Sequence, residues 1–337
     1  MTRQPADVAE LRDSHGRVAT DLRVSLTDRC NLRCTYCMPA EGLDWAPPET
    51  QLTDTELLRL LGVAVHRLGV RQVRFTGGEP LLRRSLVELV AGTRALDPDL
   101  GIQLTTNGLG LRHRAADLAA AGVNRVNVSL DSLVPETFAA ITRRDRLDEV
   151  LAGLAAAREA GLRPVKVNAV LVRGVNDHEA PDLLAWALAE GYELRFIEQM
   201  PLDAQHGWRR DEMVTADETL ARLQERFVLT PDPEHRGSAP AERFVVDDGP
   251  AQVGIIASVT RPFCGDCDRV RLTADGQVRN CLFAREESDL RTALRDGADD
   301  AELARLWQAA VAWKLPGHGI DDPSFLQPTR PMSAIGG

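Results

Sequence analysis

The sequence predicts an α/β fold in which short strands alternate with amphipathic helices and form a parallel sheet. Two observations support this: six β-rich runs each precede a helical stretch, and the units repeat with similar length from the second run onward. The expected strands are 22–27, 72–76, 102–106, 125–130, 165–171 and 193–199. The expected helices are 53–68, 84–96, 112–121, 146–160, 178–190 and 215–226. Such a repeat forms either an open doubly wound sheet or a partial barrel.

Residues typical of helix ends support these assignments. Helix-starting side chains and C-terminal glycines bracket several of the segments. They are Asp54, Asp182 and Thr215 at the starts, and Gly69, Gly122, Gly161 and Gly191 after the ends. We therefore expect the barrel core to occupy residues 1–230.

The pattern changes after residue 230. A proline-rich stretch at 231–240 reads as a linker. It is followed by expected strands at 243–246 and 252–260, a hairpin of 270–273 with 277–283, and helices at 286–295 and 299–313. We expect 231–337 to be a C-terminal region with a tail ending in Gly336-Gly337.

Charge and hydropathy exclude some classes of function. The chain has 40 basic and 50 acidic residues, a net charge of −10, which argues against a nucleic-acid-coating protein. The uncharged run at 249–260 is too short for a membrane helix, which needs about 20 residues. We expect a cytoplasmic protein with no nucleic-acid or membrane partner. Among the many arginines, Lys166 and Lys314 are the only lysines and are candidates for specific roles.

The six cysteines form two groups of three. The first group, Cys-x3-Cys-x2-Cys, follows the first expected strand, and the second combines a Cys-x2-Cys pair with a later cysteine. They are Cys30, Cys34 and Cys37, and Cys264, Cys267 and Cys281. Disulfides are not expected in a cytoplasmic chain. Three thiolates would leave one iron of a four-iron cluster open to another ligand.

Zinc is the alternative for both groups. No histidine lies near the first cysteine group, whereas His318 is a remote candidate ligand for the second. An auxiliary cluster of the many-cysteine type would need more cysteines than the chain has.

Cations occur inside the expected strands. Arg269 and Arg271 alternate on one strand, so their side chains point to the same face. Arg23, Arg74 and Lys166 lie within the βα repeat, where a charge is costly unless it lines a polar cavity. Arginine pairs suit phosphate, which they bind through two hydrogen bonds. The pattern favours an anionic substrate.

The motif Cys30-Asn-Leu-Arg-Cys34-Thr-Tyr36-Cys37, with Gly77-Gly78-Glu79-Pro80 at the next strand end, resembles the radical S-adenosylmethionine (SAM) superfamily. The resemblance implies that the open iron of the first cluster binds SAM, that Tyr36 lies beside the adenine, and that Gly78 contacts the methionine ammonium. A 5′-deoxyadenosyl radical would then abstract hydrogen from the substrate.

From about Leu22 to the C-terminus the chain resembles the GTP 3′,8-cyclases of molybdenum cofactor biosynthesis. The matching motifs are DLRVSLTDRCNLRCTYCMP, RFTGGEPLLR, TTNG, RVNVSLD, EQMP, the segment from Phe263 to Phe283, and the final Gly-Gly. The resemblance implies an incomplete (βα)6 TIM-like barrel whose C-terminal extension carries a second [4Fe–4S] cluster on Cys264, Cys267 and Cys281.

The same resemblance assigns site residues. Ser129 and Met200 would contact SAM. The residues that would contact GTP are Arg23, Arg74, Thr105, Lys166, Arg269, Val270 and Arg271. Sequence alone does not separate Thr105 from Thr106. Arg269, Arg271, Gly336 and Gly337 would act in catalysis, with the glycine tail entering the active site.

The implied reaction joins C3′ of GTP to C8 of its guanine and yields 3′,8-cyclo-7,8-dihydro-GTP. The implied partners are GTP, an electron donor protein, the downstream cyclic pyranopterin monophosphate synthase and a second copy of the chain in a homodimer. The competing classes are a peptide-modifying radical SAM maturase, which would need more auxiliary cysteines, and a non-enzymatic iron–sulfur or zinc regulator.

Overall fold

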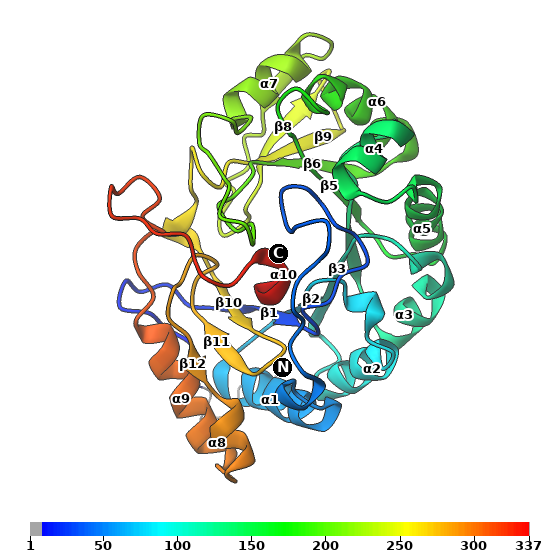
Figure 1. The fold of residues 1–337 in the computed structure, drawn as a ribbon. Coiled ribbons are helices and arrows are strands. Elements are labelled where there is room, and N and C mark those ends of the chain that lie inside the picture. The colour runs from blue at the N-terminus through cyan, green and yellow to red at the C-terminus, as the bar shows by residue number, and fades with distance from the viewer. Residues whose placement is uncertain (1–8, 337) are drawn as a thin grey trace.

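The computed structural model describes residues 9–336 and contains a twelve-stranded sheet. Its centre consists of parallel strands that neighbour one another in chain order. These are β1 (Asp21–Ser25), β2 (Gln72–Thr76), β3 (Gly101–Thr106), β4 (Arg125–Ser129), β5 (Val165–Val170) and β6 (Glu193–Ile197). The sheet curves around a central space with helices on its outer side (Figure 1). The strand order does not reverse, so the partial barrel is confirmed over the doubly wound sheet.

The expected helices are present with small shifts at their ends. They are α1 (Asp54–Leu68), α2 (Leu86–Leu96), α3 (Ala115–Ala121), α5 (Leu147–Glu159), α6 (Ala180–Glu190) and α7 (Ala216–Gln224). Capping boxes start α1 at Thr53 and α7 at Thr215, and Gly69 ends α1 with a left-handed φ of 71°. The sequence analysis missed α4 (Pro135–Thr142).

Four short 3-10 turns also belong to this half of the chain. They are η1 (Pro48–Thr50), η2 (Pro80–Leu82), η3 (Leu111–His113) and η4 (Asp177–Glu179). The turns η3 and η4 replace the first residues of the helices expected at 112–121 and 178–190. Tighter 3-10 geometry is common where helices begin.

The C-terminal region extends the barrel sheet at both edges. β9 (Gln252–Ile256) pairs parallel with β6, and β10 (Arg269–Leu272) pairs parallel with β1. Antiparallel strands continue outward as β8 (Glu242–Val246) and β7 (Leu229–Pro231) on one side, and β11 (Gln277–Arg279) and β12 (Ser288–Asp289) on the other. The hairpin of β10 with β11 is confirmed, but its second strand ends at Arg279 and not at residue 283, and β9 ends at Ile256 and not at residue 260. The domain boundary near residue 230 stays a prediction.

The last elements are α8 (Arg291–Arg295), α9 (Asp300–Ala312) and α10 (Met332–Ile335). The helix expected over 286–295 is wrong in its first half, because β12 pairs there with β11 and the helix starts only at Arg291. The short helix α10 was not expected. It lies in the middle of the curved sheet (Figure 1).

The barrel strands alternate between an apolar outer face and a polar inner face. Outward residues such as Val24, Phe75 and Val167 are fully buried in the main hydrophobic core. Their inward neighbours carry polar side chains, which line a cavity. They are Arg23, Arg74, Thr105, Asn127, Asn168, Arg195 and Arg271. This two-residue period lets the strands hold a hydrophobic core on one side and a polar site on the other.

Within residues 9–336, no helix is both long and apolar enough to cross a membrane.

Candidate active site

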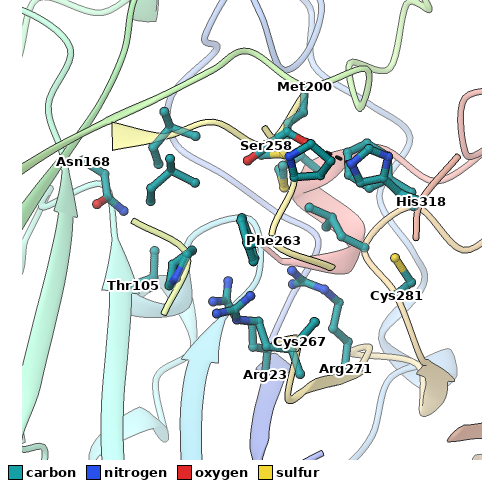
Figure 2. Close-up of a pocket in the computed structure, with 18 of the residues that line it drawn as sticks. Arg23, Thr105, Asn168, Met200, Ser258, Phe263, Cys267, Arg271, Cys281 and His318 are labelled. Atoms are coloured by element: carbon teal, nitrogen blue, oxygen red, sulfur yellow. Dashed lines mark hydrogen bonds between the residues drawn. The ribbon is translucent and has the colours of Figure 1, made fainter. Parts of the chain in front are cut away.

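The cavity inside the curved sheet gathers most of the residues that the sequence singled out (Figure 2). It is lined by the inner faces of β1–β6, the end of β9, β10 and the loops of the second cysteine group. The expected residues on its wall are Arg23, Tyr36, Arg74, Thr105, Ser129, Met200, Cys264, Cys267, Arg269, Arg271 and Cys281. Thr106 is buried outside this wall, so the geometry favours Thr105 for the cavity.

An arginine cluster forms one side of the cavity. The strand register sets Arg23 beside both Arg74 and Arg271. In Figure 2 the side chains of Arg23 and Arg271 extend into the same space near Phe263. The Nε atoms of Arg23, Arg74 and Arg269 are buried and have no hydrogen-bond partner. Buried donors of this kind are costly unless a ligand or water accepts from them, so the cluster is suited to a polyanion.

Burial and mutual repulsion lower the pKa values of Arg23, Arg74 and Arg271. Burial, with the neighbouring Arg74, lowers the pKa of Arg23 to about 9, and burial lowers the pKa of Arg74 to about 10. The pKa of Arg271 falls well below its usual range for the same reasons. Burial opposes ionisation of Asp21, but Arg23 and Arg74 outweigh it and lower the pKa of that carboxyl. A bound anion would therefore stabilise the charged forms of Arg23, Arg74 and Arg271.

Some of the expected residues lie outside the cavity wall. Lys166 forms an ion pair with Glu193 at the start of β6. Val270 is buried in the hydrophobic core between its two arginine neighbours. Gly337 lies outside the described residues.

Gly78 is also off the cavity wall and is packed against the first cysteine loop. Its N–H donates to the Thr27 carbonyl at 2.7 Å, and a Cβ at this position would lie 2.2 Å from the Arg29 carbonyl oxygen. Only glycine allows the β2 end to approach this closely.

Glu79 links the ends of β2 and β3 beneath the first cysteine group. Its carboxylate accepts hydrogen bonds from the Thr106 hydroxyl at 2.7 Å and from the backbone N–H groups of Asn107 and Leu81. Burial raises the pKa of Glu79 to about 7, although these hydrogen bonds oppose the shift. The Asn107 side chain in turn lies 3.7 Å from the Cys30 sulfur.

Tyr36 is held by an acidic partner that the sequence analysis did not select. Its hydroxyl donates to Asp131 at 2.8 Å, and the other Asp131 oxygen accepts from the Val170 N–H at 2.9 Å. Burial raises the pKa of Asp131 to about 6, against the effect of both hydrogen bonds. Asp131 therefore fixes the orientation of the Tyr36 ring at the cavity wall.

The second cysteine group lies around the 3-10 turn η5 (Cys264–Asp266) and beyond β11. The Arg17 guanidinium donates to the Cys264 carbonyl at 2.7 Å, and the Lys314 ammonium lies 3.3 Å from the Cys267 sulfur. The ring Nε2 of His318 contacts the Ser258 carbonyl at 3.0 Å, as Figure 2 shows. That nitrogen is therefore engaged away from the thiols.

Both cysteine groups have the chemistry that iron–sulfur clusters require. All six thiols are free and half-buried, and burial raises the pKa of Cys37 to about 12. Burial raises the pKa of Cys34, and the nearby charges of Asp131, Cys37 and Cys30 raise it further. Of the described residues, no three cysteine, histidine or carboxylate side chains are packed as a single-ion site requires. The fit to a cluster rests on the thiolate donor set.

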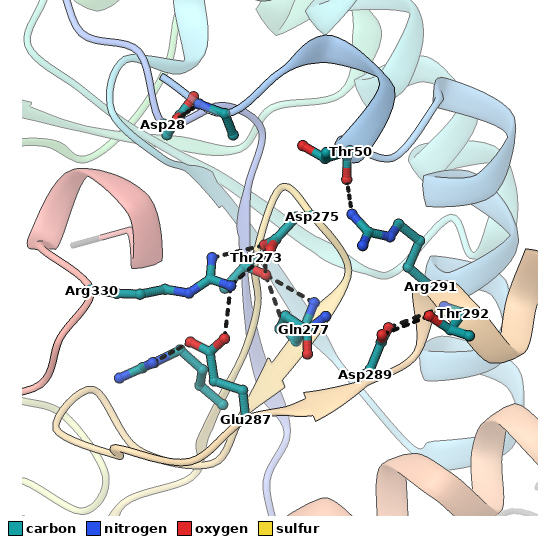
Figure 3. A network of polar contacts seen from close by, with 12 residues as sticks. Asp28, Thr50, Thr273, Asp275, Gln277, Glu287, Asp289, Arg291, Thr292 and Arg330 are labelled. Atoms are coloured by element: carbon teal, nitrogen blue, oxygen red, sulfur yellow. Dashed lines mark hydrogen bonds and ion pairs between the residues drawn. The ribbon is translucent and has the colours of Figure 1, made fainter. Parts of the chain in front are cut away.

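The C-terminal tail is anchored before it reaches the cavity (Figure 3). Arg330 bridges Asp275 and Glu287 at 2.7 Å and 2.8 Å, and Glu287 also pairs with Arg279. Beyond this anchor, the Met332 N–H donates to the Leu202 carbonyl at 2.9 Å.

The last described residue of the tail, Gly336, lies against β1 and β2. The Gly336 carbonyl accepts a hydrogen bond from the Arg271 guanidinium. A Cβ on Gly336 would lie 2.5 Å from a Thr76 methyl and 2.7 Å from the Ser25 hydroxyl. The φ of Gly336 is 76°, so both space and conformation require glycine here.

Two family models cover nearly the whole described chain. A model of the radical SAM superfamily matches residues 24–187, and a model described as Molybdenum Cofactor Synthesis C matches residues 192–320. A curated GTP 3′,8-cyclase from Streptomyces coelicolor is 66% identical, over 97% of this chain and 96% of the relative. The chain belongs to the GTP 3′,8-cyclase family. Another relative of that name, from Mycolicibacterium smegmatis, is 63% identical, over 99% of this chain and 93% of its own length.

Solved structures show the fold of this cyclase-family chain in more distant proteins. SuiB of Streptococcus suis, bound to S-adenosylmethionine, aligns with a TM-score of 0.60 at 15% identity, over 86% of this chain and 69% of SuiB. At such low identity the likeness establishes the radical SAM fold and nothing about substrate.

Sequence reasoning missed one basic residue of the cyclase-family cavity. Arg195 lies inside β6, lines the wall and donates to the Asn168 side chain at 2.9 Å. Burial lowers its pKa to about 10, although Glu193 opposes the shift. The signal was available, because Arg195 is also a charged residue in the middle of an expected barrel strand.

Proposed function

We propose that the protein is a radical SAM GTP 3′,8-cyclase that converts GTP to (8S)-3′,8-cyclo-7,8-dihydroguanosine 5′-triphosphate, the first step of molybdenum cofactor biosynthesis. The arginine cluster carries the proposal. Arg23, Arg74 and Arg269 have unpartnered Nε donors in a cavity that also meets the second cysteine group. A triphosphate supplies the negative charge and the acceptors that these donors lack.

The cavity wall and the residues around it have proposed tasks, although the first cysteine group, Gly78, Lys166 and Val270 lie outside the wall itself. Cys30, Cys34 and Cys37 hold a [4Fe–4S] cluster, which supplies the electron that cleaves SAM. Tyr36, Gly78, Ser129 and Met200 bind SAM, and Cys264, Cys267 and Cys281 hold a second [4Fe–4S] cluster. Arg23, Arg74, Thr105, Lys166, Arg269, Val270 and Arg271 bind GTP.

The arginines orient the substrate. Held by its triphosphate, GTP would present its ribose and base to the reacting centre in one geometry, and such positioning lowers the barrier entropically. Arg269, Arg271, Gly336 and Gly337 are the proposed catalytic group. The contact between Arg271 and the Gly336 carbonyl supports joint action of the tail and the cation.

Family membership supports the proposed partners. An electron donor protein reduces the enzyme, the chain forms a homodimer in the cytoplasm, and the product passes to cyclic pyranopterin monophosphate synthase. The exposed Trp313 and Leu315 next to α9 are candidate contacts for another protein.

Anaerobic reconstitution tests the proposal. The full chain should bind about eight iron atoms and form the cyclic nucleotide from GTP and SAM, as detected by mass spectrometry. Replacing Cys30, Cys34 and Cys37 with Ala should halve the iron and abolish deoxyadenosine. Replacing Cys264, Cys267 and Cys281 should halve the iron and abolish the cyclic product while deoxyadenosine still forms. SAM cleavage by the first triple variant would show that the assignment is wrong.

A further inference from the structure

Lys314 is an unusual residue for its surroundings. It is one of two lysines among 40 basic residues, and only 4% of it is exposed. Its ammonium donates to the Cys267 carbonyl at 3.0 Å and the Arg269 carbonyl at 2.9 Å, and it lies 3.3 Å from the Cys267 sulfur. It therefore bridges a cysteine of the second group and the strand that carries the arginine pair.

The charge of Lys314 has no carboxylate to balance it. Among residues 9–336, no ion pair joins Lys314 to an aspartate or glutamate. A buried ammonium without a counter-charge is costly, so it requires negative charge close by. The adjacent sulfur provides that charge when it is a thiolate.

The geometry also accounts for lysine in a chain otherwise rich in arginine. The ammonium makes two carbonyl contacts and one sulfur contact from a single nitrogen. A compact ammonium with three donors can do this, whereas the planar guanidinium fork spreads its donors over a larger area.

We propose that Lys314 sets the reduction potential of the cluster bound by Cys264, Cys267 and Cys281, through its fixed charge and its N–H donor on the Cys267 sulfur. The inference rests on the proposed function, which assigns a cluster to these cysteines. One-electron reduction adds one negative charge to the cluster, and the electron comes from the donor protein or a chemical reductant. A nearby cation and a hydrogen bond to a ligand sulfur stabilise the reduced form, so Lys314 makes the cluster easier to reduce.

The test isolates the second cluster in the full chain. In a background with Cys30, Cys34 and Cys37 replaced by Ala, Lys314→Met removes charge and donor, Lys314→Gln removes the charge, and Lys314→Arg keeps it. Reduced cluster is measured by electron paramagnetic resonance during anaerobic titration with dithionite and mediators. We expect Lys314→Met to lower the ratio of reduced to oxidised cluster at least tenfold at fixed potential, a shift of about 59 mV. Lys314→Arg should show most of the native ratio of reduced to oxidised cluster, because it keeps the charge.

Arg17 provides a matched control. It holds the same loop through the Cys264 carbonyl, but it contacts no sulfur and its charge is balanced by Asp13 at 2.6 Å. Arg17→Gln should leave the midpoint reduction potential of the second cluster nearly unchanged. An equal shift in Arg17→Gln would mean that loosening of the loop, and not the Lys314 charge, controls the potential.

Iron content separates the two ways of failing. If the background protein holds no iron, the cluster assignment in the proposed function is wrong. If iron is retained but Lys314→Met leaves the midpoint unchanged or raises it, the role of Lys314 is wrong.

Discussion

Arg195 and Lys166 are cations on adjacent strands with different surroundings. Arg195 lies on the cavity wall with Asn168, whereas Lys166 is paired with Glu193 at the strand start. Sequence resemblance selected Lys166 for the substrate, and the geometry adds Arg195. Substituting each residue therefore shows whether the cavity geometry or the sequence resemblance better identifies a cation that binds the substrate.

We expect Arg195→Ala to weaken GTP binding by about tenfold or more, because a charge-assisted hydrogen bond contributes roughly 1.5–3 kcal/mol. Lys166→Met should have a smaller effect while Glu193 holds that ammonium. Anaerobic calorimetry with GTP, and separately with SAM, measures both. SAM affinity serves as the folding control and should stay unchanged. A larger loss in Lys166→Met would indicate that Lys166 leaves Glu193 for the substrate.

Glu79 should make stability depend on pH. Burial raises the folded-state pKa of Glu79 to about 7, above the usual 4.5 of a glutamate, so between these values the folded state holds a proton that the unfolded state has lost. Stability contributed by this group therefore falls as pH rises through that window. The thermal midpoint of the cluster-free chain should drop more between pH 5 and pH 8 than that of Glu79→Gln. Parallel pH curves for the two proteins would contradict the raised pKa.

At the scale of elements, the tail depends on a distant anchor. Arg330 is fixed by Asp275, in the turn between β10 and β11, and by Glu287, which precedes β12. Burial opposes ionisation of Asp275. The ion pair with Arg330 and the hydrogen bond from Thr273 together outweigh burial and lower the pKa of Asp275. The anchor joins the tail to the hairpin that carries Arg271, so hairpin and tail reach the cavity as a unit.

We expect Arg330→Ala to lower cyclic product at least tenfold while both clusters and reductant-driven deoxyadenosine formation are retained, because a misplaced tail costs positioning energy. Deleting Gly336 and Gly337 should have the same effect. Arg210→Ala, which removes an exposed pair with Asp321, is the control and should behave as the native chain does. Full cyclisation by Arg330→Ala would show that the anchor is not needed.

The sequence predicts the barrel elements well because each follows from a local pattern. Strand and helix positions depend on periodicity and on caps such as Thr215 and Gly69. The pairing of β10 with β1 joins residues far apart in the chain, and no local pattern contains that information. The short helix α10 was missed because its position depends on contacts such as that of Met332 with the Leu202 carbonyl.

The site residues likewise divide into those that a local sequence pattern identifies and those that depend on contacts between distant segments. Cysteine spacing and charged residues within strands identify the thiols and most of the arginines of the cavity wall, because these patterns are rare in ordinary strands. Asp131 could not be selected in this way, since its role depends on Tyr36 reaching it from a distant loop. Glu198 in the EQMP motif holds the backbone of Ala216 and Val259, and only the structure reveals this.

At the scale of the whole molecule, one sheet runs through both halves of the chain. β6 receives β9 on one side and β1 receives β10 on the other, so the C-terminal region covers both edges of the six-stranded core. An uncovered parallel edge strand exposes a row of unpaired backbone groups and promotes aggregation. The cavity wall is likewise shared between the two halves.

Residues 1–230 should therefore not fold stably alone, although the sequence suggests a boundary there. We expect this fragment to be insoluble or aggregated when expressed by itself, because β1 and β6 would both become edge strands. Co-expression with 231–337 should recover soluble protein containing both fragments, which size-exclusion chromatography and circular dichroism would detect. The control is the full chain cut within 231–240 after folding, which should stay assembled. A soluble, monomeric 1–230 fragment with cooperative thermal unfolding would instead establish the barrel core as an independent domain.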